Sequence, residues 1–479
     1  MKSKYIRLIP LALSGMLLFS GYAVQQTGAY AADTTALEAA DSQTAGEAGA
    51  LSGQTISTGT SAESFEYSDV FSDRDLSGEY DTSEAVTITL NGSGATADSD
   101  MVQISGSNVS ILGAGTYVLT GTLDNGSVIV DAGEEDKVQL VLDGVNIRSD
   151  TFAALYVKQA DKVFVTLANG TTSSLSNGGS FTPIDENDVD AVVYSRDDIT
   201  FNGTGSLQIS SPAGHGIVGK DELTITAGAY EITATDNAIR ARDSIAIADG
   251  SFTVTAGNDG LHAENSDDDT LGSIYIAGGT FTVNASDDGI HATTLLQIDG
   301  GSFDVTGAEG LEATYIRIND GEIKISSSDD GVNAAYKSSA YTPTVEINGG
   351  TLTIVMDAGD TDGVDSNGNL IINGGTIDIT GQYAFDYDGT AQYNGGTIIV
   401  NGQTVDAIPN QMMGGRGGMG GYGGMGGRAD MGGRADMGGR ADMGGRADMG
   451  GRADMGGRAD MEGGADMDGG TDMESGADM

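Results

Sequence analysis

The chain has no cysteine and no tryptophan, and only five of its 479 residues are proline. Without cysteine, neither disulfide bonds nor thiolate metal sites can stabilise the fold. Stability must therefore come from packing and hydrogen-bond ladders, with hard metal ions as the remaining option. The 76 glycines indicate many tight turns and narrow cores rather than one large globule.

Basic residues are also scarce, with 22 Lys and Arg against 70 Asp and Glu. Residues 33–410 hold 12 basic and 58 acidic residues, a net charge of −46. Phosphate binding needs a basic footprint, so nucleic acid is excluded as a partner and an anionic membrane is disfavoured. A polyanionic ligand can bind only through a bridging cation. Acidity also keeps an exported protein soluble, but solubility does not explain why the acids recur at fixed repeat positions.

The first 32 residues have the pattern of an export signal. Three basic residues precede an apolar stretch, residues 8–19, which is too short to span a bilayer, and Ala29-Tyr30-Ala31 forms a small-x-small cleavage site. An uncleaved anchor is the alternative. No later segment is apolar enough to cross a membrane. We therefore expect a secreted, extracellular protein without a transmembrane anchor, and association with the cell wall is open to it.

Two further segments lack a periodic apolar pattern. Residues 33–68 are rich in Ser, Thr, Ala and Gly and are predicted to be a flexible linker. Residues 411–479 form a low-complexity tail built on the repeat Gly-Gly-Arg-Ala-Asp-Met. Two glycines per repeat oppose helix and strand, which predicts a disordered tail. A plain spacer, wall contact and a calcium response are its possible roles. Residues 69–410 remain as one domain.

Two short motifs alternate within this domain. Gly-Gly-x-(Phe/Leu/Ile)-x-(Val/Ile) begins at residues 278, 300, 349, 374 and 395, and its copies, degenerate ones included, are 20 to 29 residues apart. Asp-Gly-(Leu/Ile/Val)-x-Ala begins at residues 259, 288 and 330, with variants at 309 and 362 and weaker copies at 237 and 383. Each repeat holds three short segments in which apolar and polar residues alternate, which is typical of strands.

Strands this short cannot bury a face alone, but stacked coils can pair each strand with its equivalent one coil away, about 4.8 Å off. The sequence therefore predicts an all-β fold, a parallel β-helix over residues 86–407 with roughly thirteen coils. A β-sandwich is the main rival, but its hairpins need not keep one motif in fixed register. The second motif predicts one inward ladder, Ile239, Leu261, Ile290, Leu311, Val332, Val364 and Phe385.

The residue between the two inward positions of the second motif should point outward. These residues are all polar, which fits either a solvated face or a ligand-binding stripe. Two of the three histidines of the chain are among them, but two ligands without a third do not define a histidine metal site. The stripe comprises Arg240, His262, His291, Glu312, Asn333, Asp365 and Asp386.

The acidic turns predict bound calcium, and more than one ion. Carboxylates at equivalent positions of neighbouring coils repel by about 1 kcal/mol at 4 Å in water and by about 4 kcal/mol at an effective dielectric of 20. Cations between them would relieve this repulsion, and hard oxygen ligands on flexible turns suit calcium. The alternative is that glycine turns simply favour Asp and Asn. The predicted ligands are Asp259, Asp267, Asp269, Asp288, Asp329 and Asp330.

Several of these segments together resemble the bacterial, clostridial-type carbohydrate-binding β-helix family, which has a pectate-lyase-like fold. The resemblance covers about residues 70–408. It implies a right-handed helix, bound calcium and binding to cell-wall polysaccharide of the cellulosic or pectic kind, without implying lyase activity. The segments that carry it are Asp190–Thr200, Asp259–Asp269, Asp288–Ala292, Glu309–Ala313 and Asp329–Ala334.

The leading hypothesis is a monomeric, non-catalytic, calcium-binding protein for such polysaccharides. Sugar would contact the outward stripe at Arg240, His262, His291, Glu312, Asn333 and Asp365. The missing tryptophan leaves tyrosines for stacking on sugar rings, namely Tyr156, Tyr194, Tyr275, Tyr315 and Tyr336. One alternative is a calcium-dependent uronate lyase, and another is a surface or adhesion protein. The basic side chains near the acidic turns that a lyase could use are Arg240, Arg242, Arg317 and Lys324, of which Arg240 lies in the outward stripe within reach. No catalytic residue is assigned.

Overall fold

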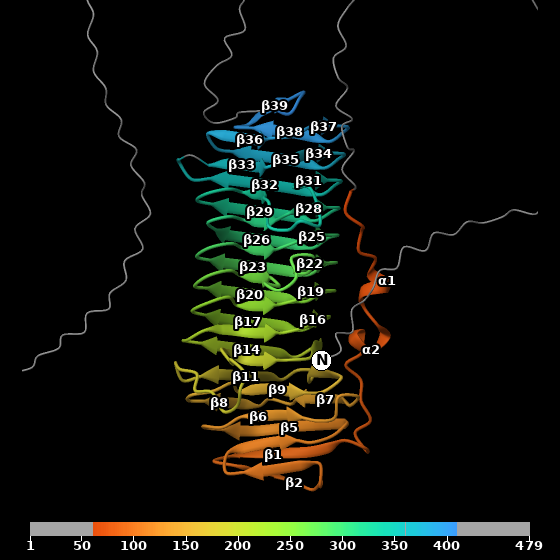
Figure 1. Cartoon of the computed structure of the whole chain (residues 1–479), viewed down its shortest axis with the longest axis vertical. Helices are drawn as coiled ribbons and strands as arrows, with labels where there is room; N and C mark the ends of the chain where they lie inside the picture. Colours follow the sequence, from red (N-terminus) through yellow and green to blue (C-terminus); the bar gives the residue numbers. More distant parts are fainter. Residues whose placement is uncertain (1–60, 360, 410–479) are drawn as a thin grey trace, which may run out of the picture. The chain divides into compact units, whose positions relative to one another are not determined.

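The structure, a computed structural model, describes residues 61–359 and 361–409 (Figure 1). It is built from short strands, most of which pair in parallel with the equivalent strand one repeat later. The strands form three rows, so each coil contributes up to three strands in chain order. The predicted parallel β-helix is confirmed. The predicted signal, residues 33–60 of the predicted linker and the tail lie outside the described residues.

The first row is a sheet of 13 strands, and it carries the Asp-Gly motif. Its members are β3 (Val102–Ser105), β4 (Asn108–Ile111), β6 (Val128–Asp131), β9 (Leu155–Gln159), β12 (Ala191–Ser195), β15 (His215–Gly219), β18 (Ile239–Ala241), β21 (Leu261–Ala263), β24 (Ile290–Ala292), β27 (Leu311–Ala313), β30 (Val332–Ala334), β33 (Asp362–Ser366) and β36 (Tyr383–Tyr387).

The second and third rows belong to one 26-stranded sheet, because the long strands β1 (Val86–Gly92) and β5 (Gly115–Leu123) join them at the N-terminal end. The second row comprises β7 (Lys137–Leu142), β10 (Lys162–Leu167), β13 (Asp198–Gly203), β16 (Glu222–Ile225), β19 (Ser244–Ile247), β22 (Ser273–Ile276), β25 (Leu295–Ile298), β28 (Tyr315–Ile318), β31 (Thr344–Ile347), β34 (Asn369–Ile372) and β37 (Ala391–Tyr393). The third row comprises β8 (Asn146–Ser149), β11 (Thr172–Asn177), β14 (Ser206–Ser211), β17 (Ala229–Ala234), β20 (Ser251–Ala256), β23 (Thr280–Ala285), β26 (Ser302–Gly307), β29 (Glu322–Ser327), β32 (Thr351–Met356), β35 (Thr376–Thr380) and β38 (Thr397–Val400).

Antiparallel pairs close both ends of the stack. β2 (Ala95–Ala97) pairs antiparallel with β1, and β3 does so with β4. At the other end β39 (Gln403–Val405) turns back on β38. These hairpins occupy the edges that a parallel stack would otherwise leave open.

The interior is one continuous apolar core that runs from Ile88 to Ile398. The seven residues of the predicted inward ladder are all fully buried in it. In the third row, Phe252, Phe281 and Phe303 stack with ring centroids 4.6 Å apart. Period-two alternation thus puts every second side chain of each strand into the core, as the sequence predicts.

Glycine is needed for two different reasons in the two motifs. In the Gly-Gly turns the second residue takes a positive φ, 108° at Gly301, which L side chains rarely adopt. In the Asp-Gly turn the reason is space. A Cβ on Gly289 would lie 2.2 Å from Cγ1 of Val305 and 2.6 Å from the carbonyl oxygen of Gly310 in the next coil.

Residues 61–80, here called the strap, lie along the outer side of the second row and include α1 (Tyr67–Val70) and α2 (Asp73–Leu76) (Figure 1). Phe71 packs on Tyr275, and the backbone N–H of Phe65 donates to Gln297 at 2.9 Å. Residues 61–68 were predicted to be part of a flexible linker and instead pack on this sheet, because their few apolar side chains meet apolar outward positions. Within the described residues, neither helix has the length and apolar character that a membrane span requires.

Candidate functional site

A row of polar side chains follows the outer face of the 13-stranded sheet from Arg240 in β18 to Asp386 in β36. Each residue of this set pairs in register with its equivalent one coil later. The structure therefore gathers the predicted stripe into one contiguous row, while its binding role stays a prediction. We call it the polar row, and its members are Arg240, His262, His291, Glu312, Asn333, Asp365 and Asp386.

Earlier coils carry apolar residues at the same outward position. Tyr156, Tyr194 and Val218 stand in register there, and Phe152 and Val189 pack over them. The polar row begins where this apolar cover ends. It is itself partly enclosed, since the side chains of His262, Glu312 and Asn333 are buried. Buried polar groups need partners, so the row is not a simple solvated face.

The acidic turns form a second ladder beside the polar row. The backbone N–H of Asp288 donates to Oδ1 of Asp259 at 3.0 Å, and the N–H of Asp362 donates to Oδ1 of Asp330 at 2.9 Å. One oxygen of each of these acceptor carboxylates thus ties its turn to the next coil. Oδ2 of Asp259, and likewise Oδ2 of Asp288 in the next turn, contacts a further partner.

That partner is a histidine three residues later in the polar row. Nδ1 of His262 lies 2.6 Å from Oδ2 of Asp259, and Nδ1 of His291 lies 2.9 Å from Oδ2 of Asp288. The two imidazole rings stack with centroids 4.7 Å apart and planes inclined by 23°. The register of neighbouring coils therefore aligns two histidine–aspartate pairs side by side.

Glu312 completes this cluster from the next coil. Its Oε2 lies 2.8 Å from Nδ1 of His291, and its Oε1 lies 2.6 Å from Nζ of Lys337. Burial opposes the charge on His291, but its hydrogen bonds to Asp288 and Glu312 outweigh burial and raise the pKa of His291 to about 10. Burial likewise opposes the charge on Glu312, but the hydrogen bond from His291 and the contact with Lys337 lower the pKa of Glu312 to about 2.

At the C-terminal end of the polar row the groups that could contact a cation are the side-chain oxygen atoms of Asn333, Asp365 and Asp386. Within the described residues, Oδ1 of Asn333 and Oδ1 of Asp386 are buried and have no hydrogen-bond partner. Burial, together with the charges of Asp330 and Asp386, raises the pKa of Asp365 to about 7. Burial, with the charges of Asp329 and Asp386, raises the pKa of Asp330 to about 6. A cation placed among these carboxylates and the amide oxygen of Asn333 would reduce the repulsion between the carboxylates.

The structure brings together only some of the predicted calcium ligands. Asp259 and Asp288 lie in neighbouring turns, and Asp330 lies beside the oxygen-rich end of the polar row. Asp267 instead pairs with Arg242, Asp269 accepts the N–H of Ser339 at 3.0 Å, and Asp329 is exposed. Two of these three belong to the insertion after β21. Asn265 shapes that insertion by accepting the N–H groups of Asp267 and Asp268.

Sequence reasoning missed a further stack of carboxylates at the start of the second row. Asp197, Asp221 and Asp243 each precede a strand of this row, and the residues that follow them pair in register. Burial and the charges of Asp198 and Asp243 raise the pKa of Asp221 to about 7. The sequence does show an Asp before each of the dipeptides Asp-Ile, Glu-Leu and Ser-Ile, which could have indicated this stack. These dipeptides have no adjacent glycine motif that would fix their position in the repeat.

The tyrosines that were considered for sugar stacking are mostly covered. Tyr156 and Tyr194 lie under the apolar cover, and Tyr275 and Tyr315 pack against the strap segment. All four are buried, whereas Tyr336 is 71% exposed. The burial arises from tertiary contacts that the strand pattern does not encode. Of the five, only Tyr336 presents a ring to solvent.

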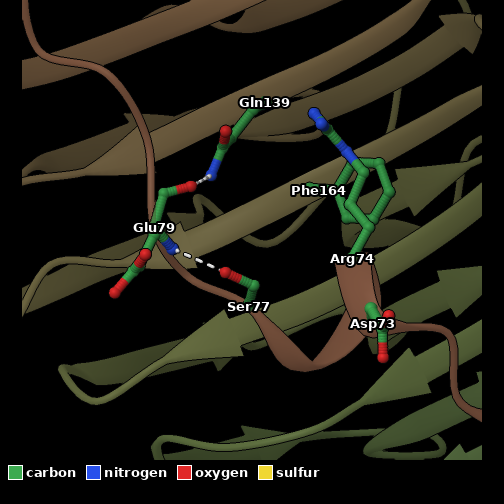
Figure 2. Close-up of a pocket in the computed structure, with 6 residues that line it drawn as sticks. All are labelled: Asp73, Arg74, Ser77, Glu79, Gln139 and Phe164. Atoms are coloured by element: carbon green, nitrogen blue, oxygen red, sulfur yellow. Dashed lines mark hydrogen bonds between the residues drawn. The ribbon is translucent and has the colours of Figure 1, made fainter.

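A hollow of about 320 Å³ lies between the strap and the second row, lined by Asp73, Arg74, Ser77, Glu79, Gln139 and Phe164 (Figure 2). Nε2 of Gln139 donates to the carbonyl oxygen of Glu79 at 3.5 Å, and the guanidinium of Arg74 lies 4.6 Å above the ring of Phe164. Arg74 thus already covers the aromatic face that a sugar ring could use. The polar row is the stronger candidate for a binding surface.

Comparison with known proteins points to one family. The model of a family described as carbohydrate-binding domain-containing protein matches residues 105–360 and 305–408. A carbohydrate-binding domain-containing protein from Acetivibrio thermocellus is 37% identical over 137 residues, which are 28% of this chain and 48% of the relative. The match thus spans about half the length of that curated relative.

A solved structure is also similar. It is that of a polysaccharide lyase-like protein from C. thermocellum, determined as a gadolinium derivative. The sequence identity is 26%, and the match covers 65% of this chain and 99% of the other, with a TM-score of 0.42.

Proposed function

Because the chain belongs to the family of carbohydrate-binding domain-containing proteins, we propose that it binds polysaccharide along the polar row without cleaving it, and that calcium takes part. The export signal predicted over residues 1–32 supports action outside the cell. The observation that carries the proposal is the oxygen-rich end of the polar row, where Asn333 and Asp386 keep buried oxygen atoms without a partner among the described residues.

The donor set at this end fits calcium. Asp330, Asp365 and Asp386 offer carboxylate oxygens and Asn333 offers an amide oxygen, which is the ligand chemistry that calcium prefers. Burial, together with the repulsion between neighbouring carboxylates, raises the pKa of Asp365 and Asp330, and a bound ion would relieve that repulsion. Calcium accepts six to eight oxygens, so when bound it supplies positive charge and spare coordination positions for a ligand carboxylate.

The favoured ligand is an acidic polysaccharide of the polyuronate kind. The net charge of −46 over residues 33–410 repels a polyanion, so direct attraction cannot hold it. The regular spacing of the coils, about 4.8 Å, instead lets an extended chain meet the same face repeatedly. Several weak contacts in register can then combine into useful avidity.

Arg240 is the basic side chain of the polar row and is therefore the candidate base of the alternative lyase reaction. Its guanidinium lies 3.5 Å from Nε2 of His215 and 3.9 Å from a carboxylate oxygen of Glu264. Arg240 is thus already engaged with the side chains of His215 and Glu264. The proposal therefore assigns it to the binding surface, at the opposite end of the polar row from the oxygen-rich cluster.

The test is binding of the whole chain to polygalacturonate, with and without a chelator, while circular dichroism monitors the fold. We expect binding that chelation abolishes from a protein that stays folded, and about tenfold weaker binding by Asp365→Asn. Asp320→Asn, at an exposed third-row turn whose carboxylate accepts only its neighbour's N–H, is the control and should bind normally. Equal binding without calcium would overturn the bridging role, and release of unsaturated uronides would overturn the non-catalytic one.

A further inference from the structure

The cluster around His262 and His291 contains imidazole nitrogens, which a calcium site does not need. Imidazole nitrogen is a poor ligand for calcium but a common one for zinc and the other late first-row divalent ions. Two stacked histidines alone would not define a site, as the sequence indicated. The structure adds the missing carboxylates from neighbouring turns, because the register of the coils brings them to the same place.

We infer that Asp259, His262 and His291 form a binding site for one divalent transition-metal ion of the zinc type, which links two neighbouring coils. Each of the three residues offers one ligand atom, and these atoms all lie within 4.8 Å of one another. Asp288, His291 and Glu312 satisfy the same criterion. The two triads share His291, so a second pair of carboxylates flanks the ion.

The distances suit such an ion. Metal–ligand bonds of about 2.0–2.2 Å place neighbouring ligand atoms of a tetrahedral site roughly 3.3–3.5 Å apart. Nδ1 of His262 lies 2.6 Å from Oδ2 of Asp259, and the ligand atom of His291 lies within 4.8 Å of both. Side-chain movements on the order of 1 Å therefore bring these three atoms to the separations that a bound ion requires.

The surroundings hold the ligands in place and favour a cation. Lys337 fixes Glu312 from its far side at 2.6 Å, and Asp259 is tied by its other oxygen to the backbone of the next coil. Glu264 lies 3.2 Å from the second ring nitrogen of His262. The carboxylates of Asp259, Glu264, Asp288 and Glu312 thus outnumber the two cations near the rings, Lys337 and Arg240. A divalent ion replaces the protons that otherwise bridge these groups.

The experiment uses the untagged full chain, stripped with chelator and then held in excess calcium so that oxygen-only sites are filled. Titration with zinc, read by calorimetry and by competition with a colorimetric chelator, should show one high-affinity zinc ion per chain. His262→Gln and His291→Gln should each weaken its binding by at least ~100-fold, and Glu312→Gln, which removes a flanking partner, by ~10-fold.

His215→Gln is the matched control, because it removes the remaining histidine and that residue lies outside both triads. It should keep the wild-type zinc affinity. Circular dichroism in chelator shows whether each variant is folded, and the visible spectrum of cobalt bound to the wild-type chain reports nitrogen ligation even where a variant fails to fold. The inference would be overturned if the wild-type chain bound no stoichiometric zinc, or if either histidine variant kept the wild-type zinc affinity. The assay contains no polysaccharide, so its outcome is independent of the carbohydrate proposal.

Discussion

The carboxylate of Asp75 in the strap lies 2.7 Å from the ammonium group of Lys162 in β10, and both side chains are largely buried. The same carboxylate accepts a hydrogen bond from Thr200 at 2.7 Å, and the backbone oxygen of Asp75 accepts one from Thr226 at 2.7 Å. One residue of the strap therefore connects to three successive strands of the second row or their ends.

We expect Asp75→Asn to lower the free energy of unfolding by about 3 kcal/mol, because removing one partner of a buried ion pair leaves the other charge uncompensated. Limited proteolysis within residues 61–80 and thermal melting both measure this. Asp73→Asn, at the exposed start of α2, should change stability little. Equal proteolysis of the two variants would contradict the assigned role of Asp75.

Stability should depend on the charge of Asp75 at low pH. Burial opposes this charge, but the hydrogen bonds from Lys162, Ser72 and Thr200 outweigh it and hold the pKa of Asp75 below its ordinary value of 3.8. A depressed folded-state pKa stabilises the fold above the unfolded value, and this contribution is lost as the pH falls through the folded value. Acid titrations of the wild type and of Asp75→Asn should therefore converge below about pH 3.8. Curves that stay parallel to low pH would show that protonation of Asp75 does not contribute to the acid sensitivity of the fold.

Ile290→Asp should destabilise the fold by at least about 4 kcal/mol, since it places an unpaired charge in the core. Ile290 is fully buried in the inward ladder. Thr255→Asp is the matched control, because Thr255 is an exposed outward residue of β20 whose partners in register, Thr233 and Asn284, are uncharged, and it should change stability by about 0.5 kcal/mol or less. Denaturant titration measures both, and a mild effect of Ile290→Asp would contradict the assigned register.

Gly289→Ala should cost about 3 kcal/mol through overpacking, because its Cβ would meet Val305 at 2.2 Å. Gly278→Ala provides a comparison in a Gly-Gly turn, where the new Cβ would lie 3.4 Å from the carbonyl oxygen of Ala248. We expect little change in thermal stability for the second variant. If both variants melt alike, spatial restriction is not the reason for glycine in the Asp-Gly motif.

Chelation should lower the melting temperature and calcium should restore it, because an ion that binds only the folded chain stabilises it by mass action, by about 2.7 kcal/mol at a hundredfold excess over Kd. The double variant Asp365→Asn, Asp386→Asn should lose most of this response, and Asp267→Asn, whose carboxylate pairs with Arg242, should keep it. An unchanged response in the double variant would move the calcium site to another turn.

The repeat pattern was sufficient to predict the fold because one register governs every coil. Ile290 and Phe303 could be placed in the core from alternation alone, and the structure buries both. The polar row followed from the same register. Contacts between distant segments could not be predicted in this way. Tyr275 alternates like an outward residue, yet the strap covers it, and the strap has no repeat that would place it.

The contacts within the candidate site also could not be predicted from the repeat, because they depend on the local shape of the turns. The spacing of Asp259 and His262 is three residues within one coil, but their 2.6 Å contact depends on the shape of the turn. Asp267 follows the same strand in sequence, and the insertion carries it to Arg242 instead. Periodicity thus identifies the positions that face one another and leaves open which side chains within reach become partners.

Because hairpins close the two ends of the stack, whole coils can be inserted or removed between them without exposing a sheet edge. β2 pairs back on β1 at one end, and β39 pairs back on β38 at the other. Every coil between them meets its neighbours through the same parallel register, so a duplicated or deleted coil would leave both closing hairpins intact. A coil gained or lost between β18 and β36 would lengthen or shorten the polar row by one residue. Genetic gain or loss of whole repeats in this part of the stack could therefore adapt the reach of this surface to longer or shorter polymers.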